Sequence, residues 1–132
     1  MCHAVSPDTM ILVVDDNAAV RDAICQFIDR ATPFKACCEA GDGVAAIGKA
    51  KERAPSLVVL DLSMPGMNGI EAASVLRGML PGTKLVGFTT FDDEFRRSLL
   101  ADTSFDMVLS KHEGLAKLAE AINALLPATD AL

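Results

Sequence analysis

Five short aliphatic runs alternate along this chain with five amphipathic patterns of helical period. Two of the runs, "MILVV" and "LVVL", are apolar at every position, which is typical of strands covered by helices on both faces. Strands joined through helices favour parallel neighbours and right-handed crossovers. We therefore expect an α/β fold with a doubly wound, five-stranded parallel sheet and helices on both faces. The expected strands are 10–14, 34–39, 57–60, 84–88 and 107–109.

The patterns between the runs predict the helices. The first helix follows Asp16 and Asn17, which are both good N-cap residues. The second opens at Asp42, turns Val44 and Ile47 toward the core, and ends before a proline. The remaining helices are expected over 70–80, from the acidic pair 92–93 onward, and from 115 to 126. The strand at 34–39 is the least apolar, so we expect it near an edge of the sheet.

Length and charge restrict the function. At 132 residues the chain suits one domain, expected at 10–127 between a polar leader, 1–9, that could be disordered and a short tail, 128–132. A net charge of −6 argues against a nucleic-acid or anionic-membrane surface. The four cysteines show no C-x-x-C spacing, and no secretory segment or apolar run near the ~18 residues of a membrane span is present. These features predict a reduced, cytoplasmic protein whose thiols are small buried hydrophobes.

Chemically active side chains follow four of the expected strands. They are Asp15, Asp16, Asp61, Thr89 and Lys111. Ligands in open α/β sheets bind beyond the carboxyl ends of the strands, so these groups are expected to converge there. Taken singly, an aspartate at a strand end is more often a helix cap, and a lysine there is usually just exposed. Together they form a pocket of hard oxygen ligands that suits Mg²⁺.

Four stretches resemble the receiver domains of bacterial two-component response regulators. They are "ILVVDDN", "LVVLDLSMPGMNGIEA", "KLVGFTTFDDE" and "VLSK", and the resemblance covers about 10–126. It implies a flavodoxin-like (βα)5 fold with strand order 2-1-3-4-5. It also implies that Asp61 is the phosphoacceptor, a carboxylate nucleophile that takes up a phosphoryl group.

The resemblance assigns the metal ligands and the groups around the phosphoryl oxygens. Mg²⁺, or Mn²⁺, would be held by Asp16 directly, by Asp15 through a water, by Asp61, and by the main-chain carbonyl of Ser63. Lys111 would pair with the phosphoryl oxygens, and Thr89 would donate a hydrogen bond to one of them. The loop after the acceptor would be shaped by Pro65 and Gly66, and Gly69 would relieve crowding at the start of a helix.

This chain departs from the family at three positions. Val108 stands where members commonly carry Tyr or Phe, and Phe105 is expected to lie before the strand, so its ring does not inherit that role. His112 stands where many members have a proline after a cis peptide. A cis bond before a non-proline residue costs about 2.5 to 4 kcal/mol, so we expect a trans bond and an exposed histidine. Phe91 occupies a position that tunes acyl-phosphate hydrolysis in the family.

The resemblance implies a phosphorylatable switch that is not an enzyme beyond its own phosphoryl transfer and dephosphorylation. Its partners would be a histidine kinase or a histidine phosphotransfer protein. An output partner would bind the face formed by the helix from 92–93, the strand 107–109 and the last helix. Phosphorylation could also drive homodimer formation, while no membrane or nucleic acid is expected for this chain.

Three alternatives remain open. The chain could be the excised N-terminal receiver of a DNA-binding transcriptional regulator, since "FTTFDDE" resembles the nitrate-regulator subfamily. A Mg²⁺-dependent phosphohydrolase of the haloacid-dehalogenase type would require Asp-x-Asp, but Asn17 follows Asp15 at that spacing. A flavin or nucleotide module would need a Gly- or Thr-rich phosphate loop, and "DDNAAVRD" has none.

Overall fold

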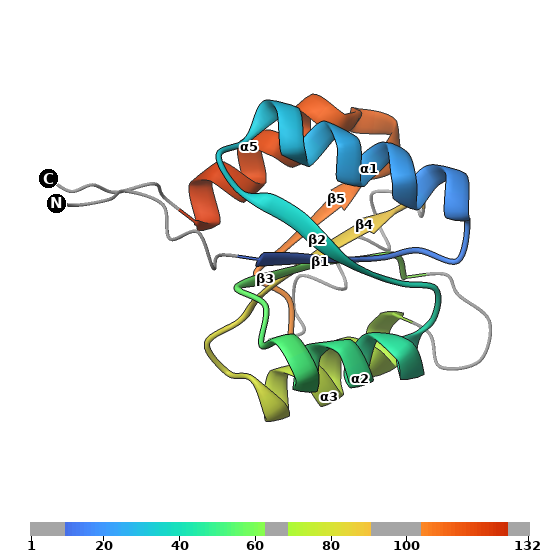
Figure 1. Ribbon diagram of the computed structural model, residues 1–132, viewed down its shortest axis with the longest axis vertical. Helices are drawn as coiled ribbons and strands as arrows, with labels where there is room; N and C mark the ends of the chain where they lie inside the picture. Colours follow the sequence, from blue (N-terminus) through green and yellow to red (C-terminus); the bar gives the residue numbers. More distant parts are fainter. Residues whose placement is uncertain (1–9, 63–68, 91–103, 127–132) are drawn as a thin grey trace, which may run out of the picture.

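The computed structural model describes residues 10–62, 69–90 and 104–126 (Figure 1). The strands are β1 (Met10–Val14), β2 (Lys35–Ala40), β3 (Leu57–Leu60), β4 (Lys84–Thr89) and β5 (Met107–Ser110). The helices are α1 (Ala18–Ala31), α2 (Gly43–Arg53), α3 (Gly69–Met79), the short 3₁₀ helix η1 (Lys111–Glu113) and α5 (Leu115–Leu125). The helix expected from Asp92 and Asp93 lies outside the described residues.

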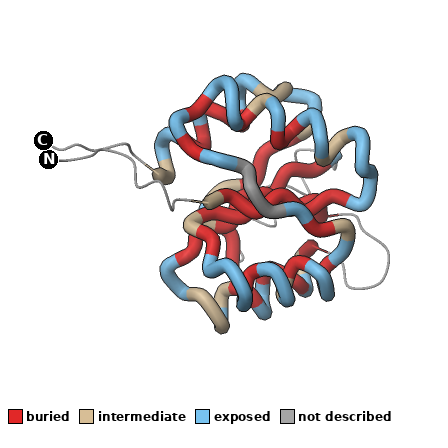
Figure 2. The backbone as a smooth tube through the Cα atoms, viewed as in Figure 1, coloured by how far each residue is buried: buried red, intermediate tan, exposed pale blue. Residues whose placement is uncertain are grey.

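The strands form one parallel sheet in the order β2-β1-β3-β4-β5. This order and the doubly wound α/β fold confirm the prediction, including the place of β2 at an edge. Helices α1 and α5 cover one face of the sheet, and α2 and α3 cover the other (Figure 1). Buried residues lie along the described strands and on the sides of the helices that face the sheet, whereas the outer sides of the helices are exposed (Figure 2).

The apolar strands explain this layering. Leu12 and Val14 of β1 pack in the cluster beneath α2 and α3, whereas Ile11 and Val13 pack beneath α1 and α5. Since successive side chains of a strand point to opposite faces, a strand buried on both sides must be apolar throughout. The core is accordingly mostly aliphatic, with Phe34, Phe88 and Phe105 as its buried aromatic residues in the described part of the chain.

Side-chain caps fix the first two helices where the sequence predicts. The Asn17 side chain accepts the Val20 N–H at 3.1 Å, and the Asp42 side chain accepts the Ala45 N–H at 2.8 Å. The prediction for Val44 is wrong, because its side chain is 67% exposed. Helix α2 instead buries Gly43, Ala46 and Ala50, and a residue next to Gly43 is rotated by about 100° away from that face.

Cys25 is buried, as expected for a small hydrophobe. Burial, reinforced by the nearby carboxylates of Glu39, Asp29 and Asp22, raises the pKa of the Cys25 thiol to about 12. The thiol is therefore protonated and unreactive at neutral pH. The side chains of the other three cysteines lie outside the described part of the chain.

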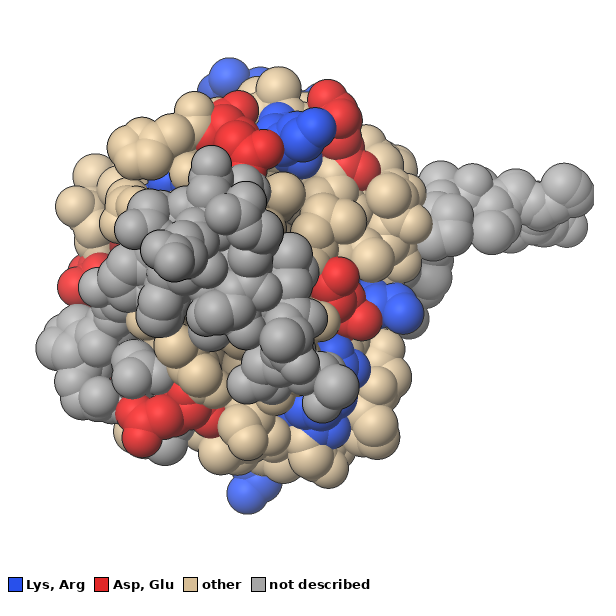
Figure 3. Space-filling model, turned by 180° about the vertical axis from the view of Figure 1, so that it is seen from behind, with Lys and Arg blue, Asp and Glu red and all other residues tan. Residues whose placement is uncertain are grey.

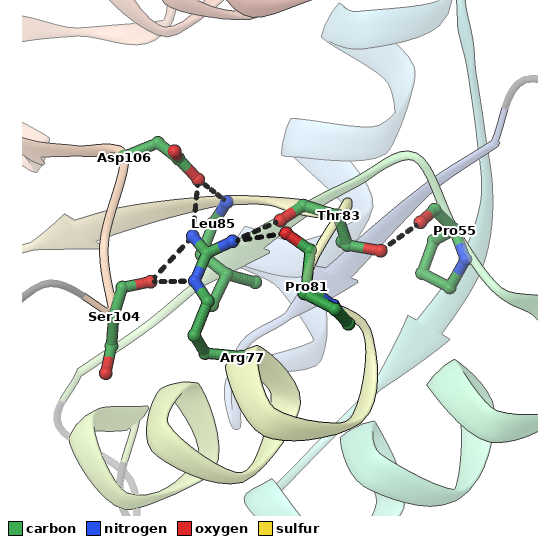
Figure 4. A network of polar contacts seen from close by, with 7 residues as sticks. All are labelled: Pro55, Arg77, Pro81, Thr83, Leu85, Ser104 and Asp106. Carbon is green, nitrogen blue, oxygen red and sulfur yellow. Dashed lines mark hydrogen bonds and ion pairs between the residues drawn. The ribbon is translucent and has the colours of Figure 1, made fainter.

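Arg77 of α3 fastens this helix to the amino ends of β4 and β5 (Figure 4). Its guanidinium donates to the main-chain carbonyls of Pro81, Thr83 and Ser104 at 2.9 to 3.3 Å. It also donates to the Asp106 carboxylate at 2.7 Å. Burial alone would raise the pKa of Asp106, but the Leu85 N–H and Arg77 outweigh it and hold this pKa below its usual value.

Candidate functional site

The acidic residues of the site are placed by the ends of β1 and β3. The Asp15 N–H donates to the Ala40 carbonyl at 3.1 Å, and the Asp61 N–H donates to the Val14 carbonyl at 2.9 Å. These bonds continue the sheet for one residue beyond each strand and bring Asp15 and Asp61 to the same edge. Asp15 is 2% exposed and Asp61 is 6% exposed. Two carboxylates are thus buried close to one another.

Lys111 lies against this pair. Its Nζ is 2.8 Å from Asp15 Oδ2 and 3.7 Å from Asp61 Oδ1. The other oxygen of Asp15 accepts the Asn17 N–H at 2.9 Å, so its carboxylate is oriented from both sides. The structure therefore brings together residues separated by 96 positions in the sequence, at the edge where the strand ends predicted them.

Asp16 completes the acidic cluster. Its carboxylate is exposed, and one oxygen from each of Asp15, Asp16 and Asp61 lies within 4.8 Å of the others. Carboxylate oxygens are the ligands that Mg²⁺ prefers, and Mg²⁺ retains several waters, which an opening at Asp16 would admit. Three carboxylates at this spacing repel one another, so the donor set and its charge fit a divalent cation.

Arg21 is a residue of this region that the sequence prediction missed. Its Nη1 donates to the main-chain carbonyl of Asp15 at 2.8 Å, and its Nε pairs with Glu39 at 2.9 Å. The guanidinium thereby links α1, the end of β2 and the turn that carries the two aspartates. Nothing in the sequence separates Arg21 from other helix arginines, because one of its partners is a backbone carbonyl.

Gly69 borders the acceptor, and Thr89 ends β4, the strand that pairs with β3. Thr89 is fully buried at the end of β4 and pairs in register with Ser110, the residue before Lys111. A Cβ on Gly69 would overlap the Asp61 carbonyl oxygen and lie 2.7 Å from the Leu62 Cα. This close approach of two backbones confirms the crowding expected at the start of α3.

The structure also shows where two of the three positions that depart from the family lie. Val108 is buried among the side chains beneath α2 and α3, and Phe105 precedes β5, as expected. His112 is exposed in η1, and the peptide bonds of the described residues are all trans, which confirms both expectations for this position. Ser63, Pro65, Gly66 and Phe91 lie outside the described residues.

The face seen in Figure 3 carries both signs of charge, with Lys and Arg side chains of the described residues interspersed among Asp and Glu side chains. In the part of the chain that the structure describes, no helix has the length and apolar character to cross a bilayer.

The parallel sheet defines a flavodoxin-like α/β domain, and the acidic cluster at its carboxyl edge has a donor set that suits a divalent cation. The family model for the response regulator receiver domain matches residues 11–123. The chain therefore belongs to the receiver domains of response regulators, the signalling modules of two-component systems.

Individual relatives agree with this assignment. The transcriptional regulatory protein YxjL of Bacillus subtilis is 39% identical over 84 residues, which are 64% of this chain and 38% of the relative. The response regulator protein VraR of Staphylococcus saprophyticus is 34% identical over 114 residues, 85% of this chain and 54% of the relative. The chain thus spans about half or less of the length of these relatives. A LuxR-family two-component response regulator from Aurantimonas superposes with a TM-score of 0.83 at 28% identity, covering 93% of this chain and 88% of that one.

Proposed function

We propose that this chain accepts a phosphoryl group on Asp61 from a histidine kinase or a histidine phosphotransfer protein in the cytoplasm. The observation that supports this most is the convergence of Asp61 with Lys111, Asp15 and Asp16 at one sheet edge. An Asp61 oxygen attacks phosphorus, the bond from phosphorus to the donor's histidine nitrogen breaks, and the released imidazole takes up a proton. The product is an acyl phosphate on Asp61.

The chain's own groups supply positioning and charge. Lys111, already 3.7 Å from Asp61 Oδ1, can neutralise the equatorial phosphoryl oxygens as charge spreads over them. The Thr89 hydroxyl can donate a hydrogen bond to one of these oxygens after transfer. Mg²⁺ or Mn²⁺, held by Asp15, Asp16, Asp61 and the Ser63 carbonyl, would supply further charge neutralisation of the transferring group. Beyond its own phosphorylation and dephosphorylation, we propose no enzymatic activity.

Phosphorylation would change the conformation of the neighbouring surface, to which an output partner binds. The new group adds about −1.5 to −2 charges, and a charge-assisted hydrogen bond to Thr89 is worth about 1.5 to 3 kcal/mol. Such a bond is large enough to shift a conformational equilibrium by tenfold or more. A groove of about 200 Å³ on β5 and α5 supports this face as the output surface. It is lined by Met107, Leu109, Lys117, Glu120, Ala121 and Ala124.

Incubation with acetyl phosphate and Mg²⁺ tests the acceptor. We expect one acid-resistant phosphate adduct by intact mass spectrometry, lost in Asp61→Asn and kept in the matched control Asp106→Asn. Continuous release of phosphate from phosphate esters without an adduct would instead indicate a phosphohydrolase. In Thr89→Ala we expect the adduct to form but the amide shifts around β4 and β5 to respond less. Unchanged shift responses would reject the role of Thr89.

The alternative of a longer DNA-binding regulator keeps the same site chemistry. It is supported by the printed names of the relatives, a transcriptional regulatory protein and a LuxR-family regulator. In that case the output surface would act on a DNA-binding domain of the same polypeptide. The length of the open reading frame distinguishes the two possibilities.

A further inference from the structure

The turn after β5 holds the backbone of Lys111 on both sides. The Ser110 hydroxyl oxygen accepts the His112 N–H at 3.1 Å, and Glu113 Oε1 accepts the Ser110 N–H at 3.0 Å. These two bonds form a reciprocal cap around η1. The Lys111 carbonyl in turn accepts the Gly114 N–H at 3.2 Å. The peptide unit between Lys111 and His112 is therefore held at both its carbonyl and its N–H, and Glu113 holds the N–H of the residue before Lys111.

This restraint matters because a lysine is a point charge on a flexible stem. Lys111 has a side chain that is 21% exposed, so packing alone restrains it incompletely. Its Nζ must nevertheless lie between Asp15 and Asp61, at 2.8 and 3.7 Å. A shift of the Lys111 backbone by about 1 Å would move the ammonium out of this position, and misplacement of that size can slow a reaction strongly.

We propose that Ser110 and Glu113 are positioning residues for Lys111, and through it for phosphoryl transfer to Asp61. The expected effect on the rate of phosphoryl transfer rests on the proposed function, whereas the expected effect on the position of the Lys111 side chain does not. Neither residue touches the acceptor in the described contacts. They act by holding the main chain from which the lysine side chain extends.

The residue at position 112 also takes part in the cap formed by Ser110 and Glu113. The cap uses the His112 N–H, while the imidazole is exposed in solvent. Any residue with a backbone N–H can fill this place, but proline cannot, and it also disfavours helical geometry at Lys111. A proline at 112 should therefore displace the backbone and side chain of Lys111, although the His112 side chain itself is exposed.

The first experiment uses paired variants of the full chain. Glu113→Ala removes the acceptor, whereas Glu113→Gln retains an oxygen that can complete the cap. We expect Glu113→Ala to lower the initial rate of phosphate incorporation from acetyl phosphate with Mg²⁺ by about fivefold, the order of a lost cap. Glu113→Gln should restore most of the rate. Glu52→Ala, an exposed glutamate of α2, is the matched control and should leave the rate unchanged.

The second readout follows Lys111 itself. In ¹⁵N,¹³C-labelled protein without phosphodonor, the Lys111 side-chain signals should shift in Glu113→Ala and in His112→Pro, and stay in place in Glu113→Gln and His112→Ala. Wild-type Lys111 signals in both Glu113→Ala and His112→Pro would overturn the proposal, whether or not phosphate is incorporated. Failure of the wild type to take up phosphate, with the lysine signals shifting as expected, would contradict the proposed function and support the positioning role.

Discussion

The two edges of the central sheet carry charged side chains in opposite arrangements. At the amino ends of β4 and β5, Arg77 donates to three carbonyls and one carboxylate, and that carboxylate also accepts a backbone N–H. At the carboxyl ends, three carboxylates lie close together, two of them buried, and the ammonium of Lys111 pairs with the two buried ones, Asp15 and Asp61. The first edge is balanced in charge, and the second has an excess of negative charge. Such an excess is destabilising unless a cation offsets it, which fits the divalent-cation site that we propose.

The largest expected effect on stability lies at the balanced edge. Arg77→Met should lower the free energy of unfolding by about 3 kcal/mol or more, because it leaves the Asp106 carboxylate and several carbonyls without their charged donor. Chemical denaturation measures this value. The control is Arg53→Met, which breaks an exposed 3.5 Å pair with Glu52 and should cost less than about 0.5 kcal/mol. Equal losses in the two variants would contradict the structural role of Arg77.

A second contrast concerns two glycines of α3. Gly69→Ala should destabilise the protein by about 1 to 3 kcal/mol, because the new methyl group meets the backbone of Asp61 and Leu62. Gly78→Ala should stabilise it by about 0.5 to 1 kcal/mol, since nothing lies within 4 Å of the added Cβ and alanine favours the helix. Thermal unfolding of both variants checks the pair. A stabilising Gly69→Ala would mean that the two backbones are not in close contact.

The sequence predicts the carboxyl edge better than the amino edge, for a physical reason. Apolar runs locate the strands, parallel strands share a carboxyl edge, and the polar residues after each run must therefore meet there. That argument places Asp15, Asp61 and Lys111 without any knowledge of side-chain geometry. The Arg77 network depends on backbone carbonyls, whose directions are set only when α3, β4 and the segment before β5 have packed together.

Helix α2 shows the same limit. A large apolar residue such as Val44 is the usual marker of a buried face, yet this helix buries glycine and alanine against its neighbours. Small residues carry little hydropathy signal, so the sequence places Val44 on the inward face by mistake, whereas Ile47 packs against the core as predicted. The crowding at Gly69 follows from the resemblance to receiver domains and not from hydropathy, and the contact of its backbone with Asp61 and Leu62 confirms it.

The stability that the Asp106 carboxylate contributes at the amino edge should decrease as the pH is lowered. The pKa of Asp106 is lowered in the folded state, so its charged form adds stability above the unfolded value of about 3.9. This contribution is lost as the pH falls below that value toward the folded pKa. Denaturation between pH 5 and pH 3 should show a steeper loss of stability in the wild type than in Asp106→Asn. Identical slopes would argue against the Arg77 and Leu85 contacts.

Removing one negative charge at the carboxyl edge should produce the smallest change in the free energy of unfolding. Without divalent ions, Asp16→Asn should raise the free energy of unfolding by about 0.5 kcal/mol, because it removes one of three mutually repelling carboxylates. Asp22→Asn, an exposed aspartate of α1, should change it less. A loss of stability in Asp16→Asn would show that the cluster is not under repulsion.

Divalent-ion binding at the carboxyl edge is tested most directly by measuring the unfolding free energy of the wild type and Asp16→Asn with increasing Mg²⁺. At Mg²⁺ concentrations several times the dissociation constant, the wild type should gain about 1 kcal/mol, and Asp106→Asn should gain the same increment. Asp16→Asn should gain much less. A wild type that does not respond, or an Asp16→Asn variant that responds equally, would contradict a metal site formed by Asp15, Asp16 and Asp61.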